Sequence, residues 1–310
     1  MLWSPSSGGS SGRTRIMPVG DIVTSPEELT RGLAAEGYLA DEGLATALFC
    51  AIRLPQPLLL EGEAGVGKTQ AAKTLASMLD TPLIRLQCFE GIDASEALYE
   101  WNYPRQLLSI RNAEAQGTGM DEASLFGRDY LIERPLLQAI EHPGPRPAVL
   151  LIDEVDRADE EFEAFLFEML AENTVTVPEI GTIEATLAPI VVLTSNRTRD
   201  LHDALKRRCL YHWIGYPDLD QATAIVRARV PMASADLATG VAEAVQRLRG
   251  LDVQKPPGIA EAIDWVQAAA LLGLVSLDES GVERTLSSVL KYREDQELAR
   301  AEGLAWVAGQ

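Results

Sequence analysis

The stretch at residues 57–72 reads Pro57-Leu-Leu-Leu-Glu-Gly-Glu-Ala-Gly-Val-Gly-Lys-Thr-Gln-Ala-Ala72, an apolar segment followed by a glycine-rich turn and a helical pattern. The pattern G-x-x-x-x-G-K-S/T, typical of a phosphate-binding loop, is satisfied by Gly62, Gly67, Lys68 and Thr69. In such a loop, backbone N–H groups surround the phosphates of a nucleotide, and glycine permits the tight turns. Because a strand precedes the pattern and a helix follows it, the stretch predicts a nucleotide site rather than an unliganded turn.

The positions of this loop have distinct expected roles. Lys68 is expected to contact the β- and γ-phosphates, and the hydroxyl of Thr69 is expected to bind Mg²⁺. The helix that begins here directs its positive end toward the anion. The predicted ligands are therefore ATP and Mg²⁺, and the predicted binding residues are Gly62, Glu63, Ala64, Gly65, Val66, Gly67, Lys68, Thr69 and Gln70.

A second motif places two carboxylates at the end of an apolar run, Ala148-Val-Leu-Leu-Ile-Asp-Glu154. Four consecutive apolar residues predict a strand buried on both faces of a parallel sheet, with Asp153 and Glu154 at its carboxyl end. There Asp153 is expected to hold the water shell of Mg²⁺, and Glu154 to activate the water that attacks the γ-phosphate. The alternative, a solvated acidic turn, is disfavoured by the phosphate-binding loop upstream.

Two further stretches carry candidate polar residues. A predicted buried strand, Pro189-Ile-Val-Val-Leu-Thr-Ser-Asn196, ends in an asparagine that could hydrogen-bond the attacking water, although asparagine is also common in turns. A later helix ends in Lys206, Arg207 and Arg208. A basic run at a helix C-terminus needs no function to explain it, since it complements the helix dipole.

Composition narrows the class of protein. The chain has 310 residues, of which 46% are hydrophobic and 24% charged, as in ordinary globular proteins. No segment approaches the roughly 18 consecutive apolar residues of a membrane span. The net charge of −19 argues against nucleic-acid binding by the chain as a whole, although a local basic patch is compatible with it. Three dispersed cysteines suit a reducing cytoplasm and offer neither a disulfide framework nor a zinc site.

The chain divides by pattern into three parts. Residues 1–20 are rich in Ser and Gly and are expected to be a disordered tail. Residues 21–215 alternate strand and helix patterns, which predicts an α/β core with a parallel sheet flanked by helices. Residues 216–310 contain only helical patterns, so we expect a small α-helical lid domain ending in one charged helix over 282–300. The aromatic segment 88–111 is expected to be a loop, either pinned to the body by its aromatic rings or exposed for substrate contact.

Five long runs carry a resemblance that is more specific than the phosphate-binding loop. From about residue 25 to 275 the chain resembles AAA+ ATPases of the MoxR branch, and within it the CoxD-like accessory ATPases encoded with molybdenum-containing carbon monoxide dehydrogenases. The runs are Arg85-Leu-Gln-Cys-Phe-Glu-Gly-Ile-Asp93, Ala97-Leu-Tyr-Glu-Trp-Asn-Tyr-Pro-Arg-Gln-Leu-Leu108, Ile152-Asp-Glu-Val-Asp-Arg-Ala-Asp-Glu-Glu-Phe-Glu-Ala-Phe-Leu166, Leu193-Thr-Ser-Asn-Arg-Thr-Arg-Asp-Leu201 and Lys255-Pro-Pro-Gly-Ile-Ala-Glu261.

The resemblance implies roles for several residues. Asn196 matches the first sensor of the family, and Arg208, with Arg207 as the fallback, matches the arginine finger that reaches a neighbouring subunit's nucleotide. Such an arginine stabilises charge on the γ-phosphoryl group, so activity would require assembly, and the family commonly forms hexameric rings. The 88–111 segment and a hairpin at 173–188 match elements that face substrate in relatives. The family's second-sensor arginine is missing from 255–261, where Lys255 is the possible substitute.

These observations together predict an ATP-hydrolysing remodelling chaperone of the cytoplasm. By the resemblance, it would help mature a metalloenzyme client such as a molybdenum-containing carbon monoxide dehydrogenase, alongside a von Willebrand factor A-type partner protein. One alternative is a nucleic-acid motor or loader, which the acidic charge disfavours. The other is a nucleotide-sensing scaffold with little turnover, which the intact Glu154 disfavours.

Overall fold

The centre of the molecule is a five-stranded parallel sheet. The computed structural model describes residues 23–118 and 121–310, so the expected tail over 1–20 lies outside the described residues. The strand order is β2-β5-β8-β1-β9, and every neighbouring pair is parallel. Their bounds are β1 Leu58–Gly62, β2 Leu83–Gln87, β5 Val149–Asp153, β8 Ile190–Ser195 and β9 Leu210–Ile214.

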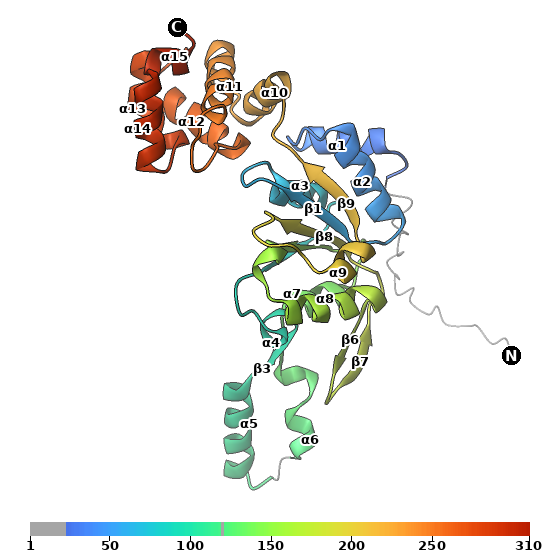
Figure 1. Ribbon diagram of the computed structural model, residues 1–310. Coiled ribbons are helices and arrows are strands. Elements are labelled where there is room, and N and C mark those ends of the chain that lie inside the picture. Colours follow the sequence, from blue (N-terminus) through green and yellow to red (C-terminus); the bar gives the residue numbers. More distant parts are fainter. Residues whose placement is uncertain (1–22, 119–120) are drawn as a thin grey trace, which may run out of the picture.

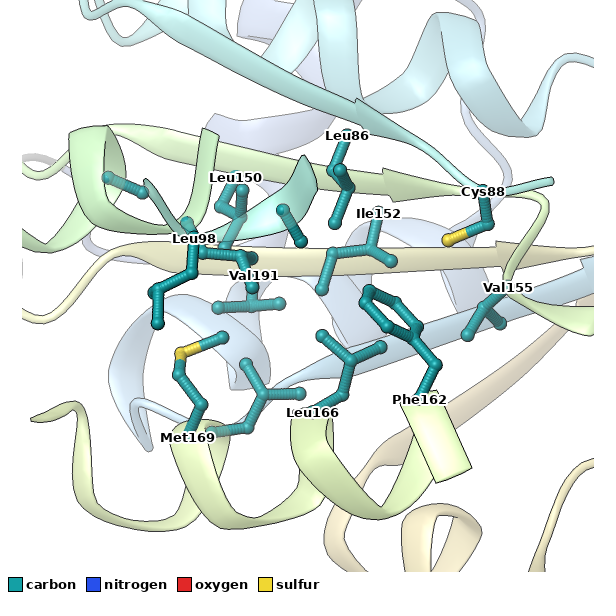
Figure 2. Packing of buried hydrophobic residues seen from close by; sticks show 14 of the residues in the cluster. Leu86, Cys88, Leu98, Leu150, Ile152, Val155, Phe162, Leu166, Met169 and Val191 are labelled. Atoms are coloured by element: carbon teal, nitrogen blue, oxygen red, sulfur yellow. The ribbon is translucent and has the colours of Figure 1, made fainter. Parts of the chain in front are cut away.

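The strands β1, β5 and β8 are buried along their whole length, and each begins with the apolar run that predicted it. Successive side chains point to opposite faces, so each strand contributes to two hydrophobic layers. One layer contains Leu151 and Val192 and packs against α1 (Pro26–Ala35), α2 (Glu42–Arg53) and α3 (Lys68–Met78). The other contains Ile152 and packs against α7 (Pro135–Ile140) and α8 (Glu160–Glu172). This second layer is seen closely in Figure 2, where Phe162, Leu166 and Met169 point from α8 to the sheet.

The chain between β2 and β5 forms an arm that projects from the core (Figure 1). It contains α4 (Ala94–Ala97), β3 (Tyr99–Trp101), α5 (Tyr103–Ala115), α6 (Glu122–Leu125), the short 3-10 helix η2 (Arg128–Tyr130) and β4 (Leu131–Glu133). The antiparallel hairpin consists of β6 (Thr174–Val177) and β7 (Gly181–Glu184) and confirms the hairpin predicted there.

The expectation of a loop over 88–111 was wrong, because this segment forms most of α4, β3 and α5. Asn102 begins α5 by accepting a hydrogen bond from the N–H of Arg105, and a proline follows in the first turn. The ring of Trp101 is 7% exposed and packs edge-on against Phe126, with a centroid distance of 5.3 Å. Leu108, farther along α5, is 62% exposed. Both predicted features are therefore present in the arm. Trp101 packs its aromatic ring at the base of the arm, and α5 carries exposed apolar side chains.

The C-terminal region is helical and has its own hydrophobic core around the fully buried Trp265. Its helices are α10 (Leu219–Arg229), α11 (Ala235–Arg249), α12 (Ile259–Leu271), α13 (Glu279–Val289), α14 (Arg293–Glu302) and α15 (Leu304–Ala308). We call this region the lid. The single final helix expected over 282–300 was wrong, since the chain leaves the helical conformation at the buried Leu290 (φ −104°, ψ 117°) and folds back along α13. No described helix has the length and apolar character to cross a membrane.

Candidate nucleotide-binding site

The phosphate-binding loop borders a cavity of about 390 Å³ at the carboxyl edge of the sheet. One wall is formed by the loop, α3 and the ends of β5 and β8, and we call it the core wall. The opposite wall, which we call the lid wall, is formed by α10 and α12. The apolar residues that line the cavity include Leu44, Val66, Ile214, Pro217, Ile225 and Ile263. The volume falls within the range of ordinary small-molecule sites.

The loop leaves the first turn of α3 open toward the cavity. Gly67 is the N-cap of α3 and has φ 99°, a left-handed conformation that glycine adopts without steric cost. A glycine cap offers no side chain, so no side-chain acceptor covers the free N–H groups at this helix end. The start of α3 therefore suits an anion such as a phosphate.

The ammonium group of Lys68 is folded into the loop. The residue is 6% exposed, and its Nζ donates to the carbonyls of Gly62 at 2.8 Å and Glu63 at 2.7 Å. Burial lowers the pKa of Lys68, and the neighbouring carboxylates Asp156 and Asp153 partly oppose that lowering. An ammonium has three N–H donors, so one remains for a phosphate oxygen. The loop therefore fits a polyphosphate, as its sequence predicts.

Asp153 lies at the end of β5 and is 2% exposed. Its Oδ1 accepts hydrogen bonds from the hydroxyls of Thr69 at 2.9 Å and Thr194 at 2.5 Å. Its Oδ2 accepts from Nε and Nη2 of Arg85, at 3.0 and 2.6 Å. The structure thus brings the two predicted metal residues, Thr69 and Asp153, into contact. A hydroxyl and a carboxylate are the oxygen ligands that Mg²⁺ accepts, directly or through water, so the residues fit this ion.

Glu154 follows Asp153 in a left-handed conformation, with φ 55° and ψ 49°. A non-glycine residue in this conformation costs about 1–3 kcal/mol, which is a strain that the surroundings must hold. The N–H of Glu154 donates to the Thr194 hydroxyl at 2.9 Å, and its Oε2 accepts from Gln87 and Arg157, both at 3.2 Å. Its other oxygen, Oε1, accepts no hydrogen bond from the described residues and is free to accept one from a water.

Asn196 lines the same cavity from the loop after β8. The buried carboxylate of Asp156, in the 3-10 helix η3 (Val155–Arg157), holds this loop. It accepts hydrogen bonds from the N–H of Asn196 at 3.3 Å and from the N–H and hydroxyl of Thr198 at 2.8 and 2.7 Å. The loop that carries Asn196 is therefore fixed to the segment just after Glu154.

Arg207 and Arg208 lie elsewhere, at the end of α9 (Asp203–Arg208). Neither is among the residues that line the cavity of their own chain. The guanidinium of Arg208 lies 4.8 Å from the ring centroid of Phe167 in α8, a cation–π arrangement. The structure thus brings together the residues of the two sequence motifs and Asn196, but not the two arginines.

The lid contacts the loop directly. The N–H of Ala260 donates to the carbonyl of Gly65 at 3.2 Å. Arg249 of α11 forms an ion pair with Glu63 of the loop, at 2.7 Å, and its guanidinium lies 4.2 Å from the ring centroid of Tyr216. Lys255, the possible substitute for a second-sensor arginine, is exposed and does not line the cavity.

Several site residues were missed by reasoning from sequence. Thr194 offered a signal, because it is a polar residue in an otherwise apolar strand, two positions before Asn196 and hence on the same face. Tyr38, between α1 and α2, lines the cavity, and burial raises the pKa of its hydroxyl, so it stays protonated at neutral pH. Arg85, Gln87 and Arg229 offered no local signal, since their positions depend on packing between distant segments.

Comparison with known proteins identifies the α/β part of the chain. Residues 57–209 match the AAA domain (dynein-related subfamily). An uncharacterized protein of Staphylococcus epidermidis is 24% identical over 264 residues, which cover 82% of this chain and 90% of that protein. An uncharacterized protein of Staphylococcus aureus strain USA300 is 27% identical over 182 residues, which cover 57% of this chain and 60% of that protein.

Among solved structures, the Thermotoga maritima RuvB Holliday junction branch migration motor covers 86% of this chain and 72% of its own. It shares 16% sequence identity, with a TM-score of 0.46. The domain match and the parallel sheet flanked by helices show that the chain has an AAA+ P-loop NTPase fold with a C-terminal helical region. None of the relatives' names identifies the MoxR branch, which stays a prediction.

Proposed function

We propose that this AAA+ domain binds ATP with Mg²⁺ and hydrolyses it to ADP and phosphate. The observation that carries the proposal is the cavity on which Lys68, Thr69, Asp153, Glu154 and Asn196 converge from three separate segments. A glycine-rich turn without a ligand would not require a buried ammonium, two adjacent carboxylates and an open helix N-terminus at one cavity.

Each residue of the site has its own role in the proposed reaction. Lys68 and the first N–H groups of α3 hold the phosphates, and Thr69 with Asp153 positions the metal. Mg²⁺ held there would supply positive charge that offsets the charge of the phosphates. The free Oε1 of Glu154 accepts a proton from the attacking water, and the Asn196 side chain orients that water. The backbone of both residues is fixed in advance, by Thr194 and Asp156, so little reorganisation precedes reaction.

We further propose that Arg208 completes the site of a neighbouring subunit in a ring, as the resemblance implies. Its place outside the cavity of its own chain supports a role in trans, and the resemblance favours it over Arg207. Hydrolysis would then require assembly, and a hexamer is the expected ring.

The client follows from the resemblance of the five long sequence runs. We propose that the ring remodels a metalloenzyme such as a molybdenum-containing carbon monoxide dehydrogenase in the cytoplasm, together with a von Willebrand factor A-type partner. The arm supports a contact with another protein, because Tyr103, Leu107 and Leu108 of α5 are 58–62% exposed.

The hydrolysis proposal is tested by phosphate release and ATP binding in three variants. Lys68→Ala should lose binding, and Glu154→Gln should keep binding but lose at least about a hundredfold in turnover. The control Glu161→Gln changes an exposed carboxylate in the first turn of α8 and should be as active as the wild type. Full turnover in Glu154→Gln would contradict the proposal, as would a wild-type protein that neither binds ATP nor releases phosphate.

The trans role of Arg208 is tested by mixing two inactive variants. Arg208→Ala alone should lose about a thousandfold in turnover. Mixed with Glu154→Gln, it should recover part of the activity, because a Glu154→Gln subunit supplies Arg208 to a neighbour whose Glu154 is intact. The same mixing experiment is done with Arg207→Ala. If Arg207→Ala is inactive alone and recovers activity when mixed with Glu154→Gln, the finger is Arg207. Equal loss in separate and mixed samples would exclude a role in trans.

The client is tested with the Glu154→Gln variant as an ATP-bound trap in native lysate. Recovery of a molybdenum hydroxylase subunit, and its absence with Lys68→Ala, would support maturation of such an enzyme. Recovery of nucleic acid in a salt-dependent manner would instead support the motor or loader alternative.

A further inference from the structure

The lid wall of the cavity is almost uncharged. It is lined from α10 by Gln221, Ile225 and Arg229, and from α12 by Ile259, Ala260 and Ile263. Among these described residues, Arg229 carries the only charge. The core wall, by contrast, contains the cationic groups of Lys68 and Lys73 as well as the start of α3. A polyanion bound to the core wall would therefore find one cation on the opposite side.

Arg229 faces the cavity because of its spacing along α10. Gln221, Ile225 and Arg229 follow one another at intervals of four residues, which places them on one face of the helix. At about 1.5 Å per residue, the face extends about 12 Å from Gln221 to Arg229. The helix α10 follows the link from β9 (Figure 1). Gln221 is near its first residue and Arg229 is its last, so Arg229 lies at the end away from the link.

Arg229 is also uncommitted. It is exposed and forms no hydrogen bond, ion pair or ring contact with any described residue. The other arginines around the site are engaged, Arg249 by Glu63 and Tyr216 and Arg85 by Asp153. A guanidinium that lines an anion-binding cavity without a protein partner has its donors available for a ligand.

We propose that Arg229 binds the polyphosphate of the bound nucleotide and is the lid's phosphate contact. The inference rests on the proposed nucleotide site and adds a residue that the sequence motifs did not indicate. It differs from the position expected in the 255–261 segment, where Lys255 does not line the cavity and Gly258 packs against the backbone of Gly65. Because a guanidinium can engage two phosphate oxygens at once, Arg229 would also draw the lid onto the nucleotide.

The test compares ligands that have phosphates with one that has none. Affinities for ATP, ADP and adenosine are measured in the Glu154→Gln background, where ATP stays intact. Arg229→Ala should weaken ATP binding about tenfold or more and leave adenosine binding unchanged, since a charge-assisted hydrogen bond is lost. Arg229→Lys should recover part of the ATP affinity, because it keeps the charge but loses the fork of donors.

The matched control is Arg227→Ala, which removes an exposed arginine from the same helix at a position that does not line the cavity. It should bind all three ligands as the parent does. Unchanged ATP affinity in Arg229→Ala would overturn the inference, as would equal losses for ATP and adenosine, which would indicate a displaced lid. Either result leaves the proposed function standing if the parent binds ATP, whereas a parent that does not bind ATP refutes the proposed function itself.

Discussion

The two walls of the cavity are built on different principles. On the core wall, the polar groups already have protein partners, so that Lys68 is held by two carbonyls and Asp153 by two hydroxyls and a guanidinium. The lid wall has apolar side chains and the unpartnered Arg229. The core wall is therefore preorganised by its own hydrogen bonds, whereas the lid wall depends on how the lid is placed. Changes to the hydrogen bonds behind Asp153 and Glu154 on the core wall should therefore act mainly on turnover, and changes to the lid wall mainly on nucleotide affinity.

Among substitutions that leave the predicted ligand residues unchanged, Thr194→Val should disturb the core wall most. The Thr194 hydroxyl joins the carboxylate of Asp153 to the N–H of Glu154, and the residue is 1% exposed. Its loss leaves the N–H of Glu154 without its partner, at a cost of about 1–3 kcal/mol, and leaves Thr69 as the remaining hydroxyl donor to Oδ1 of Asp153. We expect turnover to fall about a hundredfold while ATP affinity changes little, as measured by single-turnover phosphate release and equilibrium binding.

The control for this variant is Thr176→Val in the β6–β7 hairpin. Thr176 forms a hydroxyl–hydroxyl contact with Thr182 at an exposed position, so its removal should leave turnover unchanged. If Thr194→Val kept full turnover, the hydrogen bonds behind Asp153 and Glu154 would not be needed to hold them in position.

The core wall was predictable where its residues are neighbours in the chain. The phosphate-binding loop and the Asp153–Glu154 pair each occupy one short stretch, and an apolar strand fixes where their polar residues emerge. The contact between Asp153 and Thr194 depends instead on the register of β5 against β8, in which Ile152 lies beside Leu193. A single sequence does not contain that register, so the pairing could not be predicted.

The same limit applies to the neighbouring strand and to the lid. Gln87 lies beside Asp153 in the β2–β5 register, and Arg85, two residues earlier, shares its face and reaches the same carboxylate. In the lid, the turn at Leu290 has no glycine or proline to mark it, because the chain turns by burying an apolar side chain. Helix patterns therefore predicted the lid helices but not how the last of them fold back.

The lid wall can be displaced by Gly258→Ala. A Cβ at Gly258 would lie 2.9 Å from the carbonyl of Gly65 and 3.0 Å from that of Ala64, so backbone must move. The backbone of Gly258 itself is in an extended conformation that alanine adopts readily (φ −90°, ψ −175°). We expect ATP affinity to fall about tenfold, with turnover at saturating ATP changed less, because the carbonyls that the new Cβ meets belong to the loop and not to Asp153, Glu154 or Thr194.

Gly240→Ala is the matched control within the lid. The nearest atom to its Cβ would be the Cβ of Leu277 at 3.5 Å, an ordinary contact, and the residue lies inside α11. This variant should bind ATP normally and gain about 0.5–1 kcal/mol of stability from helix propensity, seen as a higher Tm. Normal ATP binding in Gly258→Ala would show that close contact between lid and loop is not required.

The smallest expected effect concerns the ion pair between the lid and the phosphate-binding loop, Arg249 with Glu63. The pair is partly exposed, with side-chain exposures of 18% and 52%, so its coupling should be about 1 kcal/mol or less. Arg249 also donates to the carbonyl of Pro257 and packs on Tyr216, so Arg249→Ala alone overstates the pair. A double-mutant cycle with Glu63→Ala isolates the coupling free energy between the two side chains. The quantity to measure is the ATP dissociation rate.

If the pair holds the lid on the loop, each single variant should release ATP a few times faster than the parent, and the double variant should be no faster than Arg249→Ala. The coupling should shrink as salt is raised, because the pair is reached by solvent. The Arg247–Glu243 pair, at 3.1 Å within α11, is the control, since its removal leaves the contact between the walls in place. Additive effects of Glu63→Ala and Arg249→Ala would mean that the ion pair does not hold the lid on the loop. The backbone contacts of Gly258 and Ala260 would then hold the lid.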